Sequence, residues 1–199
     1  MRAVHRSIAV AFFLSGFAAL LYQLVWQRAL FAIYGINTEA VTVVVTAFML
    51  GLGVGNHAGG VLSSRSHLPP IWLFALFELG LAVFGLLSLP LFGVVGAATL
   101  HLSAVPVALI TFALVLIPTL LMGATLPLLV SHAVRTSGNV GRSVGDLYFV
   151  NTLGSAIASI AVVVFLFRWL GQSGVVWLAA SCNLGVAAVA FRQARGATA

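Results

Sequence analysis

The sequence predicts an all-α integral membrane protein that folds as a bundle of six transmembrane helices. The prediction rests on composition, on the lengths of the apolar segments and on the distribution of arginine. Of the 199 residues, 62% are hydrophobic and only 6% are charged, whereas about a quarter of the residues of a soluble domain are charged. This composition excludes a soluble enzyme, and it excludes a disordered chain, which requires low hydrophobicity. The single Cys182 excludes a disulfide scaffold.

Six segments are long and apolar enough to cross a bilayer, because its hydrocarbon core is about 30 Å thick and a helix rises about 1.5 Å per residue. Their expected ranges are 7–26, 39–61, 71–92, 104–130, 144–167 and 174–191. The connections are short, so we expect residues 1–199 to form one membrane domain. The first segment follows two arginines, as a signal peptide does, but it lacks a cleavage site and ends in Tyr22 and Trp26. Such aromatic ends are typical of a retained helix.

Arginine predicts the orientation. With six spans, the connections alternate between the two sides of the membrane, and most of the nine basic residues fall on one side. The positive-inside rule makes that side cytoplasmic and places both termini there. The cytoplasmic set is Arg2, Arg6, Arg65, Arg135, Arg142, Arg192 and Arg195, and the outer set is Arg28 and Arg168. Scattered arginines also argue against nucleic acid as a partner, because a phosphate track needs a contiguous basic face.

Glu78 is an ionisable residue inside a predicted span, where it costs about 2.5 to 3.5 kcal/mol on insertion scales. It lies about 10 Å below the cytoplasmic edge of the third span, and Asn151 and Asn183 lie at similar depths in the fifth and sixth. We expect the three side chains to meet in one cluster. Two interpretations stay open. The cluster is a protonatable or cation-binding substrate site, or it is a polar contact that only stabilises the bundle.

Polar residues also mark the outer end of the first span. Gln23 and Gln27 lie four residues apart on one face of the helix, and Gln23 is a further candidate substrate contact. Arg28 and Glu39 flank the outer connection, where they form either an ion pair that closes the hairpin or an external gate. We expect Asp146 to cap the fifth helix, because an acid is favoured at the positive end of the helix dipole.

Glycine and proline predict how the middle spans pack. Gly51, Gly55 and Gly59 are spaced by four and form a flat strip suited to close helix contact. The same residues contain a G-x-G-x-G pattern, which also occurs in nucleotide-binding loops. Such a loop follows a strand and opens a helix, whereas these glycines end a predicted membrane span, so we favour a role in packing. Pro118 and Pro127 interrupt the fourth span. They predict either a functional hinge, as in the broken helices of transporters, or an ordinary proline-containing membrane helix.

The sequence shows no catalytic or metal-binding set. The five histidines lack ligand spacing, and each of the three acidic residues has another explanation. No nucleophile motif of the G-x-S-x-G kind is present. We therefore expect no catalytic residue, no metal and no cofactor.

Five motifs, in order along nearly the whole chain, resemble the membrane domain of bacterial spermidine-synthase-like fusion proteins. They are FLSGFAALLYQLVWQR at 13–28, AFMLGLGVG at 47–55, LFELG at 76–80, LMGATLP at 121–127 and LYFVNTLG at 147–154. The resemblance implies a bundle similar to one half of a major facilitator superfamily transporter. Arg65, after the glycine-rich end of the second span, looks like a degenerate form of that superfamily's loop between helices two and three.

The chain departs from the family in two ways. In the fusion proteins an aminopropyltransferase-like domain follows the membrane part, whereas this chain ends at Ala199, so we do not expect it to be an enzyme. Many relatives have Glu where this chain has Gln23. That difference leaves Glu78 as the acid that lies deep in the membrane.

The expected function is that of a transporter-like module for a small cationic, polyamine-like solute. A half-size bundle would then pair with a second copy or with a second membrane half. The alternative is a non-catalytic anchor or regulatory subunit of a separate, soluble aminopropyltransferase-like enzyme, and a truncated fusion protein without independent activity is a third hypothesis. The resemblance places the chain in the lipid bilayer of the bacterial cytoplasmic (inner) membrane.

Overall fold

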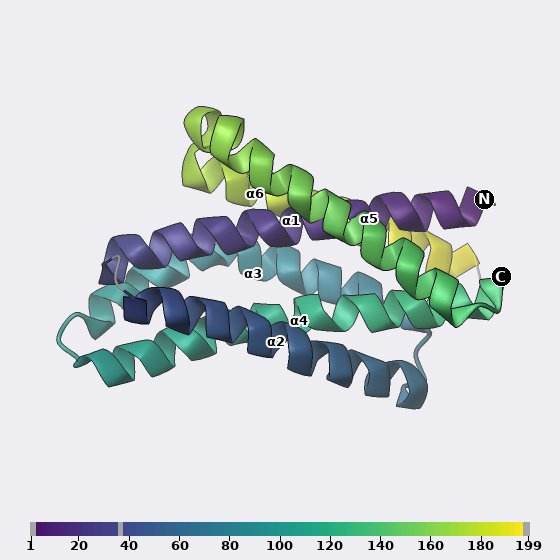
Figure 1. Ribbon diagram of the computed structural model, residues 1–199, viewed down its shortest axis with the longest axis horizontal. Helices are drawn as coiled ribbons and strands as arrows, with labels where there is room; N and C mark the ends of the chain where they lie inside the picture. Colours follow the sequence, from purple (N-terminus) through teal and green to yellow (C-terminus); the bar gives the residue numbers. More distant parts are fainter. Residues whose placement is uncertain (1–2, 36–37, 197–199) are drawn as a thin grey trace.

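A computed structural model describes the backbone of residues 3–35 and 38–196, without the side chains at 3–5, 38–40, 104, 136 and 196. The described residues form helices and no strand. The elements are α1 (Ala3–Tyr34), α2 (Thr38–Arg65), α3 (Pro70–Thr99), α4 (Ala104–Ser137), α5 (Val140–Ala161), the short π-helix η1 (Val162–Leu166) and α6 (Phe167–Gly196). They lie side by side in one elongated bundle (Figure 1).

Five helical segments in the described part of the chain are long and apolar enough to cross a membrane, so the chain has the architecture of a multi-span membrane protein. The number is below the predicted six because the last segment runs without a break from Val140 to Arg195, over 56 residues. A straight helix of that size would be about 84 Å long. The backbone is not helical throughout, because Gly171 has φ 64° and ψ −175°. This residue falls in the predicted connection between the fifth and sixth spans.

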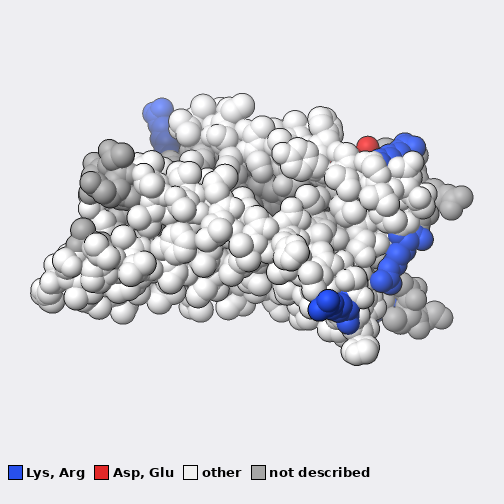
Figure 2. All heavy atoms as spheres, turned by 60° about the horizontal axis from the view of Figure 1, so that its bottom comes forward, with Lys and Arg blue, Asp and Glu red and all other residues white. Residues whose placement is uncertain are grey.

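Large hydrophobic side chains cover the outside of the bundle. Val163 is 71% exposed, Val94 is 69% exposed and Ile160 is 64% exposed. In the view of Figure 2, the charged side chains lie near the two ends of the molecule, and the broad surface between them carries none. A contiguous apolar surface of this kind would cause aggregation in water. It is the surface expected of helices that face lipid.

α1 and α3 run parallel and contact each other along most of their length. Trp26 Nε1 donates to Ser88 Oγ at 2.9 Å, and the hydroxyls of Tyr34 and Thr99 are 3.0 Å apart. The partners are 62 positions apart in sequence in the first pair and 65 in the second. A sequence separation that stays nearly constant along two helices shows that they run in the same direction. α1 also packs against α5 and α6. It is therefore the helix around which the others are arranged.

The predicted glycine strip of α2 is confirmed as a packing surface. Gly51, Gly55 and Gly59 are buried and face α4. A Cβ atom added to Gly55 would lie 2.2 Å from the carbonyl oxygen of Leu120, and one added to Gly123 of α4 would lie 2.4 Å from the α2 backbone. Glycine on both helices thus allows the two backbones to approach closely, as small residues do in membrane helix pairs.

The prolines of the fourth span do not break the helix, since α4 continues through Pro118 and Pro127. Each proline lacks the N–H that would bond to the carbonyl one turn earlier. Thr119 follows Pro118, and its Oγ1 donates to the carbonyl oxygens of Val115 and Leu116 at 3.0 and 2.9 Å. The helix is continuous in this conformation, and the hinge interpretation stays a prediction.

The predicted cap of the fifth helix was wrong. α5 begins at Val140, before the expected start near residue 144, and the side chain of Asn139 accepts a hydrogen bond from Arg142 N at 2.9 Å. Asp146 lies beyond the first turn and forms an exposed ion pair with Arg142 at 3.6 Å. The earlier start of the helix gives the capping role to asparagine, which is a favoured N-cap residue.

Gly55→Ala tests the close contact between α2 and α4. The new Cβ would overlap the Leu120 carbonyl, and overpacking of a core costs about 1–3 kcal/mol. We expect a lower melting temperature in detergent, measured by scanning fluorimetry. Gly53→Ala is the matched control, because Gly53 is exposed on the same helix with nothing within 4 Å of its Cβ position. Equal losses in the two variants would contradict this account of the strip.

Candidate functional site

Glu78 is the centre of a buried polar contact between three helices. It lies eight residues after Pro70, or about 12 Å along α3, and it is 0% exposed. Ser15 Oγ of α1 donates to Oε1 at 2.5 Å, and Asn183 Nδ2 of α6 donates to Oε2 at 2.5 Å. Both carboxyl oxygens therefore have a donor, each from a different neighbouring helix.

The carboxyl of Glu78 has no cationic partner in the described part of the chain. The ion pair seen there is the exposed one between Arg142 and Asp146. Asn183 adds a further oxygen to this site, because its Oδ1 is buried and has no hydrogen-bond partner among the described residues. Buried charge is normally paired. A carboxyl with no cationic side chain beside it can take up a proton or an incoming cation.

The structure brings together only part of the predicted cluster. Asn183 meets Glu78 as expected, whereas Asn151 Nδ2 donates to the Phe12 carbonyl at 3.3 Å. The expectation that all three side chains meet was therefore wrong for Asn151. The physical reason is that α5 packs closely on α1, where a Cβ on Gly16 would lie 2.3 Å from the Asn151 carbonyl oxygen. Similar depth along two helices does not place their side chains on facing surfaces.

The sequence analysis missed Ser15, and it wrongly placed Tyr22 and Trp26 at the membrane interface, since both are buried and α1 continues to Tyr34. Ser15 holds Glu78 directly. Tyr22, two turns further on, is 0% exposed, and its hydroxyl has no hydrogen-bond partner among the described residues. Its ring stacks on Trp26 with 5.0 Å between centroids and lies against Gly85 of α3. The spacing of 15, 22 and 26 follows one helix face, and this pattern was the available signal.

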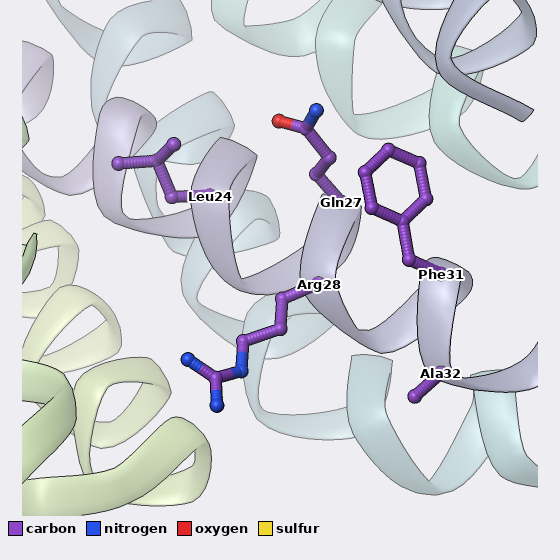
Figure 3. A pocket seen from close by; sticks show the side chains of 5 residues that line it. All are labelled: Leu24, Gln27, Arg28, Phe31 and Ala32. Carbon is purple, nitrogen blue, oxygen red and sulfur yellow. The ribbon is translucent and has the colours of Figure 1, made fainter. Parts of the chain in front are cut away.

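The outer end of α1 carries a separate shallow pocket. It has a volume of about 330 Å³ and is lined by Leu24, Gln27, Arg28, Phe31 and Ala32. In Figure 3 the side chains of Gln27 and Arg28 point in different directions. The Arg28 guanidinium lies over the Phe167 ring, 4.9 Å from its centroid. This cation–π contact places the Arg28 guanidinium against the beginning of α6.

The sequence analysis also named Gln23 and Glu39 at this end. Gln23 is half-buried and does not line the pocket, and it makes no hydrogen bond to the described residues. The structure therefore does not join Gln23 to Glu78. The side chain of Glu39 lies outside the described residues, so its expected ion pair with Arg28 stays a prediction.

Comparisons with known proteins return nothing for this chain. No protein-family model, no curated protein and no solved structure matches it. The fold and the site geometry therefore carry the functional argument. The resemblance to the membrane domain of spermidine-synthase-like fusion proteins rests on the five sequence motifs.

Ser15→Ala tests the contact that α1 makes with Glu78. It leaves one carboxyl oxygen without its donor, and an unsatisfied buried group costs about 1–3 kcal/mol. We expect reduced stability to denaturant in mixed micelles, followed by circular dichroism. Ser181→Ala is the matched control, because that exposed hydroxyl donates only to the Trp177 carbonyl of its own helix. If both variants unfold at the same denaturant concentration, Ser15 does not stabilise the bundle through Glu78.

Proposed function

We propose that the chain is a transporter-like module for a small cationic, polyamine-like solute, with Glu78 as the group that binds the cation or a coupled proton. The observation that carries the proposal is a carboxyl with 0% exposure that is held by neutral donors only. An ionisable residue inside a membrane domain is a functional-site hypothesis by default. The bacterial cytoplasmic membrane is the location that goes with this proposal.

The other interpretation of Glu78, a purely stabilising contact, is weaker because the bundle already makes such contacts with neutral groups. Trp26 and Ser88 join α1 to α3, and Asn151 joins α5 to the α1 backbone. A neutral hydrogen bond between membrane helices contributes about 0.6 kcal/mol on average. An acid adds an insertion cost of about 2.5 to 3.5 kcal/mol. Helix packing can be stabilised by neutral hydrogen bonds without the insertion cost of an acid.

The oxygens around Glu78 fit an alkylammonium group. An ammonium has three N–H donors and no acceptor, so it needs several oxygens around it. Glu78 supplies two carboxyl oxygens, Asn183 supplies its unpartnered Oδ1, and the Ser15 hydroxyl can rotate to accept. Since Glu78 is fully buried, a solute reaches it only when α1, α3 and α6 move apart. The proposal therefore requires a second conformation, in which these helices are separated and Glu78 faces the solute path.

The proposal includes a membrane topology of six spans with both termini in the cytoplasm. The non-helical Gly171 divides the 56-residue segment, and the start of α1 and the end of α6 lie at the same end of the bundle (Figure 1). The arginine-rich end is then cytoplasmic by the positive-inside rule. A path for solute would be enclosed by a second copy or by a second membrane half.

Cysteine labelling tests this topology. In a Cys182→Ser background we expect Arg168→Cys to react with a membrane-impermeant maleimide in intact cells, because it lies on the outer side. Arg65→Cys and Arg192→Cys should react only after the cells are permeabilised. All three arginines are exposed, so packing does not block the reagent. Labelling of position 192 from the outside would rule out six spans with both termini inside.

Uptake by Glu78→Gln tests the function. We expect purified protein in proteoliposomes to take up radiolabelled putrescine or spermidine. The variant should lose uptake about tenfold or more, since about 1.4 kcal/mol of lost binding is tenfold. Asp146→Asn is the control acid at the surface and should transport normally. The melting temperature of each variant separates loss of function from loss of fold.

Two outcomes would overturn parts of the proposal. Normal uptake by Glu78→Gln would remove Glu78 from the mechanism. The absence of uptake by the unaltered protein, together with its co-purification with a soluble aminopropyltransferase-like enzyme, would favour the alternative function as a non-catalytic anchor or regulatory subunit.

A further inference from the structure

The arginine-rich end of the bundle carries a second pocket, unrelated to Glu78. It has a volume of about 400 Å³ and lies between the beginning of α3 and the end of α6. Its lining consists of Trp72, Ala188, Phe191, Arg192 and Arg195. The pocket thus combines apolar side chains with two guanidinium groups at the edge of the predicted membrane region.

The pocket has an apolar wall and a cationic rim. Trp72 and Phe191 are in edge-to-face contact, with 5.1 Å between ring centroids. Arg192 and Arg195 are exposed, and their spacing of three places them on one face of α6. Trp72 is also in the first turn of α3, near the positive end of the helix dipole. Both the guanidinium groups and this helix end favour an anion.

The order of side chains along α6 matches the order of groups in a phospholipid. Trp177 and Leu184 are 64% and 43% exposed, and the exposed Ala188, Arg192 and Arg195 follow. Spacings of three, four and seven keep these residues on one face of a helix. Ser181 lies on the same face, but its hydroxyl donates to the Trp177 carbonyl of its own helix. The large side chains of the face are therefore apolar within the predicted membrane region, and the face becomes basic at its edge. A soluble phosphate would need only the basic part.

We propose that this pocket binds the headgroup phosphate of an anionic phospholipid of the cytoplasmic leaflet, with the acyl chains along the apolar face of α6. Guanidinium groups bind phosphate through paired charge-assisted hydrogen bonds. Tryptophan is favoured at the level of the headgroups, and basic pockets between helices on the cytoplasmic side are typical lipid sites. The lipid joins α3 to α6, the two helices that also share the Glu78–Asn183 hydrogen bond.

Thermal unfolding in detergent with added lipid tests the proposal. We expect phosphatidylglycerol to raise the melting temperature of the unaltered protein, and phosphatidylcholine and inorganic phosphate to have no comparable effect. In Arg192→Gln/Arg195→Gln, the concentration of phosphatidylglycerol for half-maximal stabilisation should rise about tenfold, because both charge-assisted contacts are lost. Arg192→Lys/Arg195→Lys keeps the charges and should bind with intermediate affinity.

A matched control separates the pocket from the general charge of this end. Arg65→Gln/Arg135→Gln removes two exposed arginines that lie outside the pocket, and it should respond to phosphatidylglycerol as the unaltered protein does. Equal responses from this variant and from Arg192→Gln/Arg195→Gln would overturn the assignment to the pocket. Equal stabilisation by inorganic phosphate and by phosphatidylglycerol would overturn the assignment to a lipid. Neither result depends on whether the chain transports a solute.

Discussion

The hydrocarbon core of a bilayer offers no hydrogen-bond partners, and the arrangement of this bundle follows from that constraint. Each polar group carried into the membrane must find its partner inside the protein. α1 forms such contacts with two helices. Ser15 and Trp26 bond to Glu78 and Ser88 of α3, and the Phe12 carbonyl accepts from Asn151 of α5. α2 and α4 meet the same constraint differently, because their contact is made by glycines and needs few polar side chains.

Much of the fold was predictable because each signal is local. Helix formation and membrane insertion depend on the run of apolar residues, and the Gly51, Gly55 and Gly59 strip depends on spacing within one helix. The boundaries were less predictable, since the helices extend past the predicted ends of the spans and α5 begins before the predicted start. Non-helical Gly171 lies within the range expected for a connection, but the helical structure on both sides of it joins two predicted spans into one long segment.

The site was predictable only in part, because depth along a helix and rotation about its axis are different quantities. Sequence gives the depth, so Glu78, Asn151 and Asn183 were expected at one level. The rotation is set by packing, and it turns Asn151 towards α1 while Asn183 reaches Glu78. Ser15 was missed because one serine in an apolar helix is a weak signal. Ser15 meets Glu78 only because α1 and α3 lie parallel in one particular register. That register is set by tertiary packing and is not visible in the sequence of α1.

The sequence positions of the groups around Glu78 have a consequence for how the chain is made. Ser15 precedes Glu78 by 63 positions and Asn183 follows it by 105. When α3 leaves the ribosome, α1 is already synthesised, whereas α6 is not. The acid therefore enters the bilayer with one of its two donors already made, and the second arrives only with the last helix. The order of synthesis thus makes α1 the early partner of the acid and α6 the helix that completes the closed bundle.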